Sequence, residues 1–518
     1  SKVDGSHVFA GDVRLPGMVF ASIRHAPLDG GEVTALDEER VAGQPGLVQL
    51  VRGRNWVAAL GETWWAAERA LLRLAPQFAA ERPVKSDVIA AKLGEAVRGG
   101  DTVRIDERGE GLSDDYAPDI ARRYDIAPAL HATLETSTAT ARLADGLLEL
   151  WMPCQAPEAA RAAAAKAIDI SPSNVVLYPV SAGGSFDRRL DHTIAIQIAL
   201  LAREAGRPVQ LTWSRLEEHS ASYPRPPAAC LMGAQLGAEG TIQQLRMRVA
   251  SPPTMREFGH RLFDNYTTGS AIAAAEGTRD DLAVSGGLSS YAFPRAVLEH
   301  VPTSLTLPTG PMRGQADAMT CFMRESFLDE IAHEHGREPQ SYRIAMLGTD
   351  VPLAQCLQMA ARLSQWDGGR PGTSQGLACH RMDLGDASGR IALVAQASAG
   401  EGGIRVSRLS ACVNIGRVVN RDIALQQIEG GLLYGMALAL GSATEYADGR
   451  PTHERLAALG LPTLATAPAI EITLIDSDDT PFDPGGIGVP CVAPAIANAY
   501  FSATGRRLRR LPLLSAPG

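Results

Sequence analysis

The feature that most constrains this chain is a glycine-rich segment near its end that leads directly into a helix-forming segment. Gly485, Gly486 and Gly488 lie within four residues, and the segment Ala493–Ala499 that follows is rich in alanine. Such glycines let another part of the molecule approach the backbone closely, and the first turn of a helix carries unpaired N–H groups. The pattern predicts a tight loop at the N-terminus of a buried helix, which is typical of a binding site.

Two further glycine-bearing loops precede segments with helical periodicity. Residues 181–186 follow an expected strand and lead into a helix expected from Asp187 to Ala205, and residues 309–315 precede a helix expected from Ala318 to His335. Each loop has two interpretations: an anion-binding loop at a helix N-terminus, or a tight turn that only lets a helix and a strand pack. The succession of strand, loop and helix indicates an α/β fold.

Shorter patterns predict the other elements. Alternating apolar residues indicate strands, and apolar residues at a spacing of three and four indicate helices. The polar segment Glu81–Pro118 is expected to be a linker. Strands are expected at His7–Val13, Met18–Ile23, Leu47–Val51, Leu147–Trp151, Val175–Val180, Val209–Trp213, Ile242–Met247, Ala296–Leu307, Ile391–Gln396, Ile404–Val413 and Ala469–Ile475, and helices at Trp64–Leu74 (capped by Thr63), Pro157–Ala167 and Ile423–Leu440.

Length and charge narrow the class of protein. A chain of 518 residues suggests two to four domains, and its net charge of −9 argues against nucleic acid or an anionic membrane surface as the main partner. No stretch is expected to span a membrane, because the longest apolar candidate, Ile194–Leu201, is too short. The seven cysteines show no CxxC spacing, so neither a zinc site nor a disulfide framework is predicted.

Several polar residues are candidates for a site. Arg313 lies in a glycine-flanked loop, where its guanidinium either binds a carboxylate or phosphate or is simply solvated. Arg188 and Arg189 open an expected helix, where cations are disfavoured unless a bound anion or neighbouring carboxylates offset them. His131 and Glu135 would face each other if their segment were helical, and a structural hydrogen bond is then the expected role.

Common catalytic motifs are absent from the sequence. It contains no nucleophile elbow, no Walker loop and no HExxH helix. The chain begins with Ser1 rather than with methionine, which is consistent with a processed terminus or a part of a longer protein. A terminal serine with a free amine can act as a self-activated nucleophile, so Ser1 is a second candidate for chemistry.

Taken together and in order, these segments resemble the molybdopterin-binding subunit of the molybdenum hydroxylases, the xanthine dehydrogenase and aldehyde oxidase family. The isoquinoline 1-oxidoreductase beta-subunit type is the form that it resembles. Each motif alone is weak, but the ordered set covers nearly the whole chain. The resemblance is carried by Lys2–Gly5, Asp12–Met18, Gly183–Leu190, Tyr223–Pro226, Gly310–Arg313, Glu325–Glu330, Gly416–Asn420, Gln427–Gly431, Ala493–Ala495, Thr504–Gly505 and Arg509–Pro512.

The resemblance implies a mixed α/β, multidomain fold. We expect an α/β hammerhead domain at residues 1–110, a first molybdopterin-binding-type domain at 111–355 and a second, incomplete one at 356–518. It also implies a molybdenum–pterin cofactor, often extended by cytosine dinucleotide, and a separate 2Fe-2S subunit. Substrates of the family are aldehydes and aromatic N-heterocycles, and a glutamate beside the metal acts as general base. The implied compartment is the bacterial cytoplasm, or the periplasm if a signal segment precedes Ser1.

The resemblance assigns site residues by position, and no protein side chain is assigned as a metal ligand. Arg313 and the position of the glutamate, here Val489, are the catalytic positions. The cofactor-binding positions are Gly183, Gly184, Ser185, Phe186, Arg313, Gln427, Gly486 and Gly488.

The sequence departs from the family pattern at several points, among them Gly314–Ala316 after the arginine and a shorter segment after Val489, and three further departures bear on the site. Val489 stands where the family has its glutamate, and valine cannot accept a proton. Asp187 replaces a glycine and would bring a negative charge into a crowded anionic site. The Gly-Gln-Gly segment that contacts the pterin occurs nowhere in the 518 residues. We therefore expect another chain, or a segment removed by cleavage, to supply it.

Two functions follow from these departures. In the first, the chain is a component of a molybdenum hydroxylase with an atypical active site. In the second, the fold has been repurposed without the cofactor, as a non-redox enzyme that uses Ser1 or as a non-catalytic scaffold.

Overall fold

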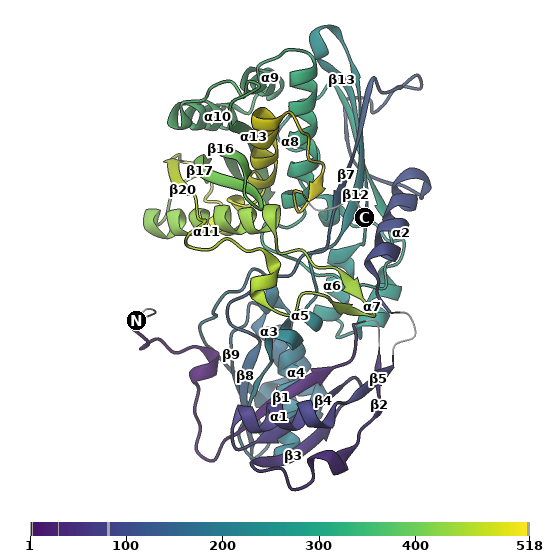
Figure 1. Ribbon diagram of the computed structural model, residues 1–518, viewed down its shortest axis with the longest axis vertical. Helices are drawn as coiled ribbons and strands as arrows, with labels where there is room; N and C mark the ends of the chain where they lie inside the picture. Colours follow the sequence, from purple (N-terminus) through teal and green to yellow (C-terminus); the bar gives the residue numbers. More distant parts are fainter. Residues whose placement is uncertain (1, 3, 29–30, 80–82, 515–518) are drawn as a thin grey trace.

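The computed structural model describes residues 2, 4–28, 31–79 and 83–514, and Ser1 lies outside them. Figure 1 shows two parts, one above the other, that are joined by several crossings of the chain. The lower part contains one large mixed sheet, and the upper part contains two sheets with helices between them. The fold is mixed α/β and multidomain, as the sequence predicts.

A seven-stranded sheet forms the lower part, in the order β10-β9-β8-β11-β1-β4-β3. Val19 of β1 pairs with Val209 of β11 in parallel, so the beginning of the chain and residues 138–212 share this sheet. The predicted boundary at residue 110 thus separates two segments of one sheet, and the division into three domains stays a prediction. The strands are β1 (Val19–His25), β3 (Leu47–Arg52), β4 (Trp56–Gly61), β8 (Thr138–Ala144), β9 (Leu147–Met152), β10 (Val175–Pro179) and β11 (Val209–Thr212).

Helices cover both faces of this sheet, which explains why all six residues of β4 are buried. Trp56, Ala58 and Leu60 pack with α3 and α4, whereas Val57 and Ala59 pack with α1 on the opposite face. This is the alternation of side chains that a strand imposes. The helices here are α1 (Trp64–Leu74), α3 (Pro157–Ile168), α4 (Thr193–Ala205) and the short α5 (Arg215–Ser220).

The bounds of α1 agree with the sequence prediction. The Thr63 hydroxyl accepts a hydrogen bond from the Ala66 amide at 3.1 Å, which satisfies one of the free N–H groups of the first turn. Ala75 ends the helix in the left-handed conformation with φ of 43°. Local side-chain chemistry therefore determines this helix.

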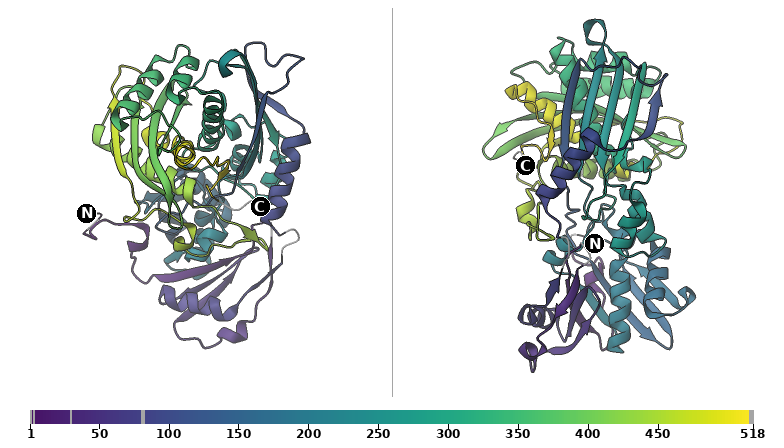
Figure 2. Two further views of the ribbon diagram at one scale, coloured as in Figure 1. Left: turned by 45° about the horizontal axis from the view of Figure 1, so that its top comes forward. Right: turned by 90° about the vertical axis from the view of Figure 1, so that its right-hand side faces the viewer.

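Two sheets form the upper part, and α8 and α13 lie between them (Figure 2, left). α2 packs on the outer face of the six-stranded sheet, and α10 on the outer face of the four-stranded sheet. The six-stranded sheet has the order β21 (Arg510–Leu511), β7 (Ile120–Ile126), β12 (Ala228–Leu236), β13 (Ile242–Ser251), β14 (Arg295–Pro302), β6 (Val103–Arg108), and the four-stranded sheet has the order β15 (Gln375–Leu384), β16 (Ala387–Gly400), β17 (Gly403–Asn414), β20 (Ala469–Ile475).

The remaining elements complete this part and its contacts with the lower sheet. The helices are α2 (Ser86–Gly99), α6 (Thr254–Leu262), α7 (Thr268–Ala275), α8 (Asp317–Glu334), α9 (Pro339–Met346), α10 (Val351–Ser364), α11 (Arg421–Leu440), α12 (Pro484–Ile487) and α13 (Val492–Thr504), and two small pairs are formed by β2 (Glu32–Ala35) with β5 (Gln77–Ala79) and β18 (Tyr446–Ala447) with β19 (Arg450–Pro451).

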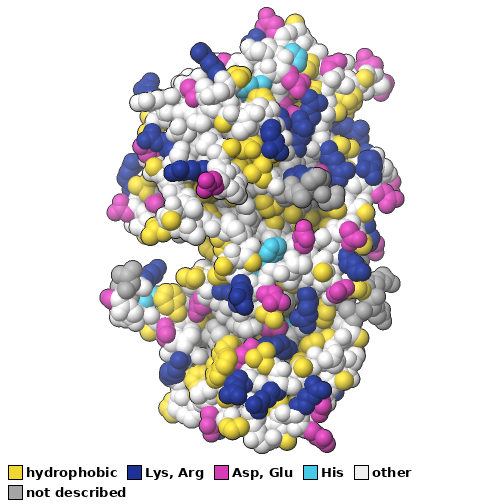
Figure 3. Space-filling model, in the orientation of Figure 1, with side chains coloured by type: hydrophobic (Ala, Val, Ile, Leu, Met, Phe, Trp, Pro, Cys, Tyr) yellow, Lys and Arg dark blue, Asp and Glu magenta, His cyan; other side chains and the backbone are white. Residues whose placement is uncertain are grey.

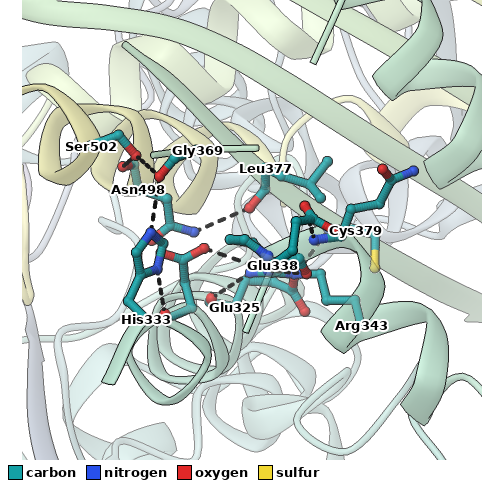
Figure 4. Close-up of polar contacts among 12 residues, drawn as sticks. Glu325, His333, Glu338, Arg343, Gly369, Leu377, Cys379, Asn498 and Ser502 are labelled. Atoms are coloured by element: carbon teal, nitrogen blue, oxygen red, sulfur yellow. Dashed lines mark hydrogen bonds and ion pairs between the residues drawn. The ribbon is translucent and has the colours of Figure 1, made fainter. Parts of the chain in front are cut away.

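α8 is buried on all sides, so its charged residues need partners inside the protein. Arg343 of α9 donates to the Glu325 carboxylate at 2.8 Å, and the Cys379 amide of β15 donates to the same oxygen at 3.1 Å (Figure 4). Burial alone would raise the pKa of Glu325, but Arg343 and Arg324 hold it below its usual range. This network fastens α8 to its neighbours.

Two predicted segments differ from the structure near the N-terminus. The predicted strand at His7–Val13 is wrong, because Ala10–Asp12 forms a 3₁₀ turn in which the Asp12 carboxylate accepts from the Phe9 amide at 2.9 Å. The predicted linker Glu81–Pro118 is also wrong, because it contains α2 and β6. Apolar residues on one face of α2 pack against the six-stranded sheet.

Two predictions around the glycine loop at residues 181–186 also fail. The helix expected from Asp187 begins only at Thr193, whose amide is capped by the Asp191 carboxylate at 2.8 Å. The segment that holds His131 and Glu135 is not helical, so these side chains do not form the expected pair.

Two helices have the length and apolar composition of a membrane span, whereas the sequence analysis named only Ile194–Leu201 as a candidate. Arg421–Leu440 and Pro484–Thr504 both pass that test. Inside the protein, 56% and 83% of these apolar windows are buried, as in the core helices of a folded protein.

Candidate functional site

A cavity of about 740 Å³ lies where several segments from distant parts of the sequence meet. Gln155 and Ser185–Asp187 come from the lower part, and the other lining residues come from the upper part. Figure 3 shows the surface indented at its left edge between the two parts. The lining includes Gln155, Ser185, Phe186, Asp187, Ser285, Arg313, Gly314, Asp317, Arg381, Asp383, Gln426, Gln427, Gly430, Phe482, Asp483, Gly485 and Gly486.

The cavity brings together five of the predicted cofactor-binding residues: Ser185, Phe186, Arg313, Gln427 and Gly486. Their roles stay predictions. The other four predicted positions, Gly183, Gly184, Gly488 and Val489, are not among the residues that line it.

Arg313 connects three of the converging segments. Its side chain donates to the Gly485 carbonyl at 2.6 Å and to the Gln427 carbonyl at 2.8 Å, and its backbone amide donates to the Phe186 carbonyl at 3.2 Å. Burial lowers the pKa of Arg313 despite the opposing influence of Tyr434 and Asp187. The arginine therefore holds the final loop against α11 at the edge of the cavity.

The loop at Gly183 is closed by Glu135, for which the sequence indicated a different partner, His131. The Gly183 amide donates to the Glu135 carboxylate at 2.8 Å, and the Glu135 amide donates to the Gly183 carbonyl at 2.9 Å. A Cβ at Gly183 would lie 2.6 Å from the Cβ of Glu135, so only glycine fits. Since Glu135 lies 48 residues earlier and shows no motif, sequence reasoning missed this partner.

Val489 faces an apolar cluster rather than the open cavity. The side chain is 2% exposed and packs with Met312, Tyr434 and Leu438. Phe186 stacks on Tyr434 at a centroid distance of 4.4 Å and lies between this cluster and the cavity. No proton acceptor is therefore present at the position where the family resemblance expects a glutamate.

The loop at Gly485–Gly488 differs from the predicted tight loop that leads directly into one long helix. Pro484–Ile487 forms the short helix α12, capped by the Asp483 carboxylate, and α13 begins only at Val492. A Cβ at Gly488 would lie 2.6 Å from the Ile428 carbonyl oxygen and 3.0 Å from the Cα of Gly431. Gly488 thus serves the close packing of loop and helix, whereas Gly486 lines the cavity.

Carboxylates outnumber arginines in the cavity lining. Asp187, Asp317, Asp383 and Asp483 line it together with Arg313 and Arg381. The sequence indicated Asp187 and both glycine loops, but Asp317 and Arg381 carry no local signal of a site.

Asp187 lies in the left-handed region with φ of 72°, and Gln155 donates to its carboxylate at 3.2 Å. Burial raises the pKa of Asp187, and Asp483 adds to this effect, while Gln155 and Arg313 oppose it. Asp187 is consequently closer to its neutral form than an exposed aspartate is. This lessens its repulsion of an anionic ligand.

Asp317 is held from behind by a buried histidine. Arg324 donates a hydrogen bond to His380 Nδ1 at 2.9 Å, so this nitrogen is the acceptor and Nε2 carries the ring proton. His380 Nε2 then donates to the Asp317 carboxylate at 2.7 Å. The Ser285 hydroxyl donates to the other carboxylate oxygen. This chain fixes the orientation of the Asp317 side chain.

Arg188 and Arg189 do not support an anion in the Gly-Gly loop. Arg188 donates to Glu218 at 2.9 Å and to Asp191 at 3.1 Å, and Arg189 donates to the Ser137 hydroxyl at 2.9 Å. Neighbouring carboxylates offset the cations, as in the second alternative, although the pair is buried and not at the surface.

The residues present fit a pterin-sized cofactor. A cavity of about 740 Å³ lies within the usual range of ligand sites, and Arg313 and the Gln426 and Gln427 amides supply donors. Gly430 and Gly486 have no side chain, so their backbone faces the cavity directly. No group of three or more His, Cys, Asp or Glu residues within the described part of the chain is placed to hold a metal ion.

Comparison with known proteins agrees with this geometry. Residues 102–346 match a family described as molybdopterin cofactor-binding domain, and residues 391–468 match a second family with the same description. The beta chain of isoquinoline 1-oxidoreductase from Brevundimonas diminuta is 26% identical over 99% of this chain and 67% of that protein. A component of the nicotinate dehydrogenase of Pseudomonas putida is 25% identical over 99% of this chain, which spans 45% of that protein.

A solved structure supports the fold. Quinoline 2-oxidoreductase from Pseudomonas putida 86 superimposes with a TM-score of 0.76 at 14% identity, over 99% of this chain and 95% of that one. The two domain matches, the relatives along the full chain and the cavity between the matched segments lead to one conclusion. The chain belongs to the molybdenum hydroxylase family and is related to its large, molybdopterin-binding subunits.

Proposed function

We propose that this chain holds the molybdenum–pterin cofactor of a heteromeric hydroxylase in the cavity of about 740 Å³. The observation that carries the proposal is the convergence of Ser185, Phe186, Arg313, Gln427 and Gly486, from four separate segments, on this one cavity. These are the residue types and positions that the family resemblance assigns to the cofactor.

The chain's own residues would bind and orient the cofactor. Arg313 keeps the Gly485 carbonyl and α11 in place, and the Gln427 side chain remains at the cavity wall. Phe186, stacked on Tyr434, shields the apolar cluster behind it from water. When bound, the cofactor supplies the redox chemistry of hydroxylation.

The proposal includes an atypical active site. Val489 provides no carboxylate, and Asp187 is the lining carboxylate whose pKa burial raises. Asp187 therefore holds a proton on its carboxyl to higher pH than an ordinary aspartate does.

Restoring the family glutamate tests whether residue 489 alone makes the site atypical. Val489→Glu places a carboxyl group in the apolar cluster of Met312, Tyr434 and Leu438. We expect this variant alone to show no hydroxylase activity toward an aldehyde or an N-heterocycle, because Asp187 and the absent Gly-Gln-Gly segment are unchanged. Turnover of either substrate by the single variant, with no added chain, would contradict the proposal.

The proposed partners are a 2Fe-2S subunit and a segment with the Gly-Gln-Gly sequence. This segment is absent from the 518 residues, and the chain spans 67% of its isoquinoline-oxidising relative. We propose that the same polypeptide or another chain contributes it. The proposed cofactor carries a cytosine dinucleotide, and nucleotide analysis of the cofactor released from the protein tests this extension.

The proposed substrate is an aromatic N-heterocycle or an aldehyde. Two curated relatives that match along the full chain are named for N-heterocycles, isoquinoline and nicotinate. Assays of the native complex with both classes, with an artificial electron acceptor, distinguish them.

Metal and pterin analysis of the protein, purified with its partners from its own host, tests the proposed function. We expect molybdenum and pterin in stoichiometric amounts. Their absence from an intact native complex would contradict the proposal and favour a repurposed fold without the cofactor.

A further inference from the structure

One part of the wall of the large cavity contains none of the predicted cofactor-binding residues. We call it the Asp317 wall, and it consists of Leu282, Ser285, Ser289, Asp317, Met382 and Leu384. Its segments contact one another, because the Ser285 hydroxyl donates to the Asp317 carboxylate and the Ser289 hydroxyl donates to the Arg381 carbonyl at 3.0 Å. The function proposed above gives the Asp317 wall no role.

Asp317 is buried, but its side chain reaches the cavity. The side chain is 8% exposed and lines the cavity. His380 Nε2, at 2.7 Å, and the Ser285 hydroxyl are its hydrogen-bond partners within the described residues, whereas the two oxygens of a carboxylate can accept about four hydrogen bonds. A Cβ at Gly286 would clash with Asp317 Oδ1, so this glycine leaves the carboxylate uncovered. Asp317 therefore has acceptor capacity left for a ligand.

No arginine or lysine in the described part of the chain forms an ion pair with Asp317; its basic neighbour is His380. Arg324 donates to His380 Nδ1 at 2.9 Å and is only a donor, so the ring proton lies on Nε2 even though neighbouring acidic groups favour a second one. Arg381, at the edge of the Asp317 wall, donates to the Asp383 carboxylate at 2.8 Å. A buried carboxylate without a full counter-charge is costly, and N–H donors of a ligand reduce this cost.

Apolar side chains belong to the same wall. Leu282 and Leu384 are 53% and 59% exposed, and Met382 is buried. Leucines that stay this exposed beside a cavity offer apolar surface that a bound ring would cover. The Asp317 wall thus combines a carboxylate of fixed orientation with apolar contacts, which together suit the polar edge and one face of a planar ring.

We infer that Asp317 binds the edge of a planar ring that carries two adjacent N–H groups, as an amidine or a 2-aminopyrimidine does. Each N–H donates to one carboxylate oxygen, which gives a charge-assisted, bidentate pair. This inference rests on the proposed function, because it concerns the ligands of the same cavity. Such an edge belongs either to the pterin of the cofactor or to a substrate of this class. An aldehyde group has no N–H to donate and is not recognised in this way.

The test is a ligand-observed NMR titration of the full chain with benzamidine, which has two N–H groups on one planar edge and needs neither molybdenum nor a partner. We expect saturable binding by the wild type, and binding about tenfold weaker or lost in Asp317→Asn, because a charge-assisted bidentate contact is removed. Asp386→Asn, in the exposed turn between β15 and β16, removes the same charge outside the cavity lining and should bind as the wild type does. Benzoate has the same shape but only acceptors, so it should not displace benzamidine.

Methyl NMR of the methionines locates the probe without a change at Asp317. The Met382 signal, assigned with Met382→Leu, should shift when benzamidine is added, because this side chain is part of the Asp317 wall. Free pterin distinguishes the two sources: it displaces benzamidine if the pterin edge binds Asp317, and it does not if the wall accepts only a substrate. No saturable benzamidine binding, equal binding by the wild type and Asp317→Asn, or an unmoved Met382 signal would overturn the inference. Metal and pterin analysis of the native complex would still decide the proposed function.

Discussion

Two carboxylates inside α8, Glu325 and Asp329, and one carboxylate of the large cavity, Asp187, have opposite surroundings. Glu325 and Asp329 lie against Arg343, at 2.8 and 3.5 Å, and the surrounding cations hold the pKa of both groups below the usual range in spite of burial. Asp187 accepts a hydrogen bond from the Gln155 amide at 3.2 Å, and burial raises its pKa although Gln155 and Arg313 oppose this effect. The same chemical group is thus fully paired in one region and underpaired in the other.

This difference distinguishes carboxylates that stabilise the fold from carboxylates that can bind a ligand. A buried ion pair with all its hydrogen bonds made fixes packing and leaves no capacity for a ligand. A carboxylate in a cavity wall with few partners keeps that capacity, and perturbed groups of this kind mark functional sites. Substitutions in the paired α8 network and substitutions in the cavity can test this distinction separately.

The largest effect is expected where a complete ion pair is broken. Arg343→Met leaves Glu325 buried with its main counter-charge removed, which should lower the free energy of unfolding by about 3–5 kcal/mol. Urea denaturation measures the change. Arg54→Met is the control, since its pair with Glu32 is exposed and should contribute at most about 1 kcal/mol. Equal losses in the two variants would mean that burial does not distinguish these pairs.

A smaller effect is expected from the glycines of the final loop. In Gly488→Ala the new Cβ would meet backbone atoms of α11 at 2.6 and 3.0 Å, so the variant should lose about 1–3 kcal/mol of stability. In Gly486→Ala the nearest atom is the Met382 methyl at 3.6 Å, and stability should change by less than about 0.5 kcal/mol. If Gly486→Ala destabilises the chain as much as Gly488→Ala, the assignment of Gly486 to the cavity and Gly488 to packing is wrong.

Arg313→Lys keeps the charge at the cavity but loses the forked donors to Gly485 and Gln427. Each lost bond to a charged donor contributes about 1.5–3 kcal/mol, so we expect faster hydrogen exchange in residues 483–490 and less bound pterin. Arg381→Lys, which alters a half-exposed cavity arginine, is the control. Unchanged exchange in Arg313→Lys would show that the arginine does not hold the loop.

The smallest effect is expected from Asp187→Asn. Because the folded protein raises the pKa of Asp187, ionisation opposes folding at pH 7, and this cost disappears as the pH falls through that pKa. The variant should melt slightly higher than the wild type at pH 7, and the two should converge near pH 4. Glu325→Gln should shift the melting temperature in the opposite direction at pH 7, because its folded pKa is lowered. If Asp187→Asn melts at a lower temperature than the wild type at pH 7, the ionised Asp187 carboxylate stabilises the fold and the proposed difference from Glu325 is wrong.

Elements with local signals could be predicted from the sequence. The bounds of α1 follow from the Thr63 cap and those of β20 from an alternating apolar run. The helix α2 within Glu81–Pro118 is hard to predict, because its apolar face is short and is interrupted by polar residues. Helix starts failed where a side chain caps the backbone locally, as Asp191 does at Thr193.

Only the site residues that belong to local motifs could be predicted from the sequence. Arg313, Phe186 and the final loop carry motifs, and the cavity brings them together. The pairs Glu135–Gly183 and Asp317–His380 join residues 48 and 63 positions apart. Neither pair has a spacing that a single sequence reveals, so only the fold places these partners.

The most direct test of cofactor binding in the large cavity is an experimental structure of the complex purified from its own host. We predict pterin density in the cavity, in contact with Phe186, Arg313 and Gln427, with the side chain of Val489 behind Phe186. A molybdenum-containing complex in which this cavity is empty and the cofactor lies elsewhere would contradict the proposed function.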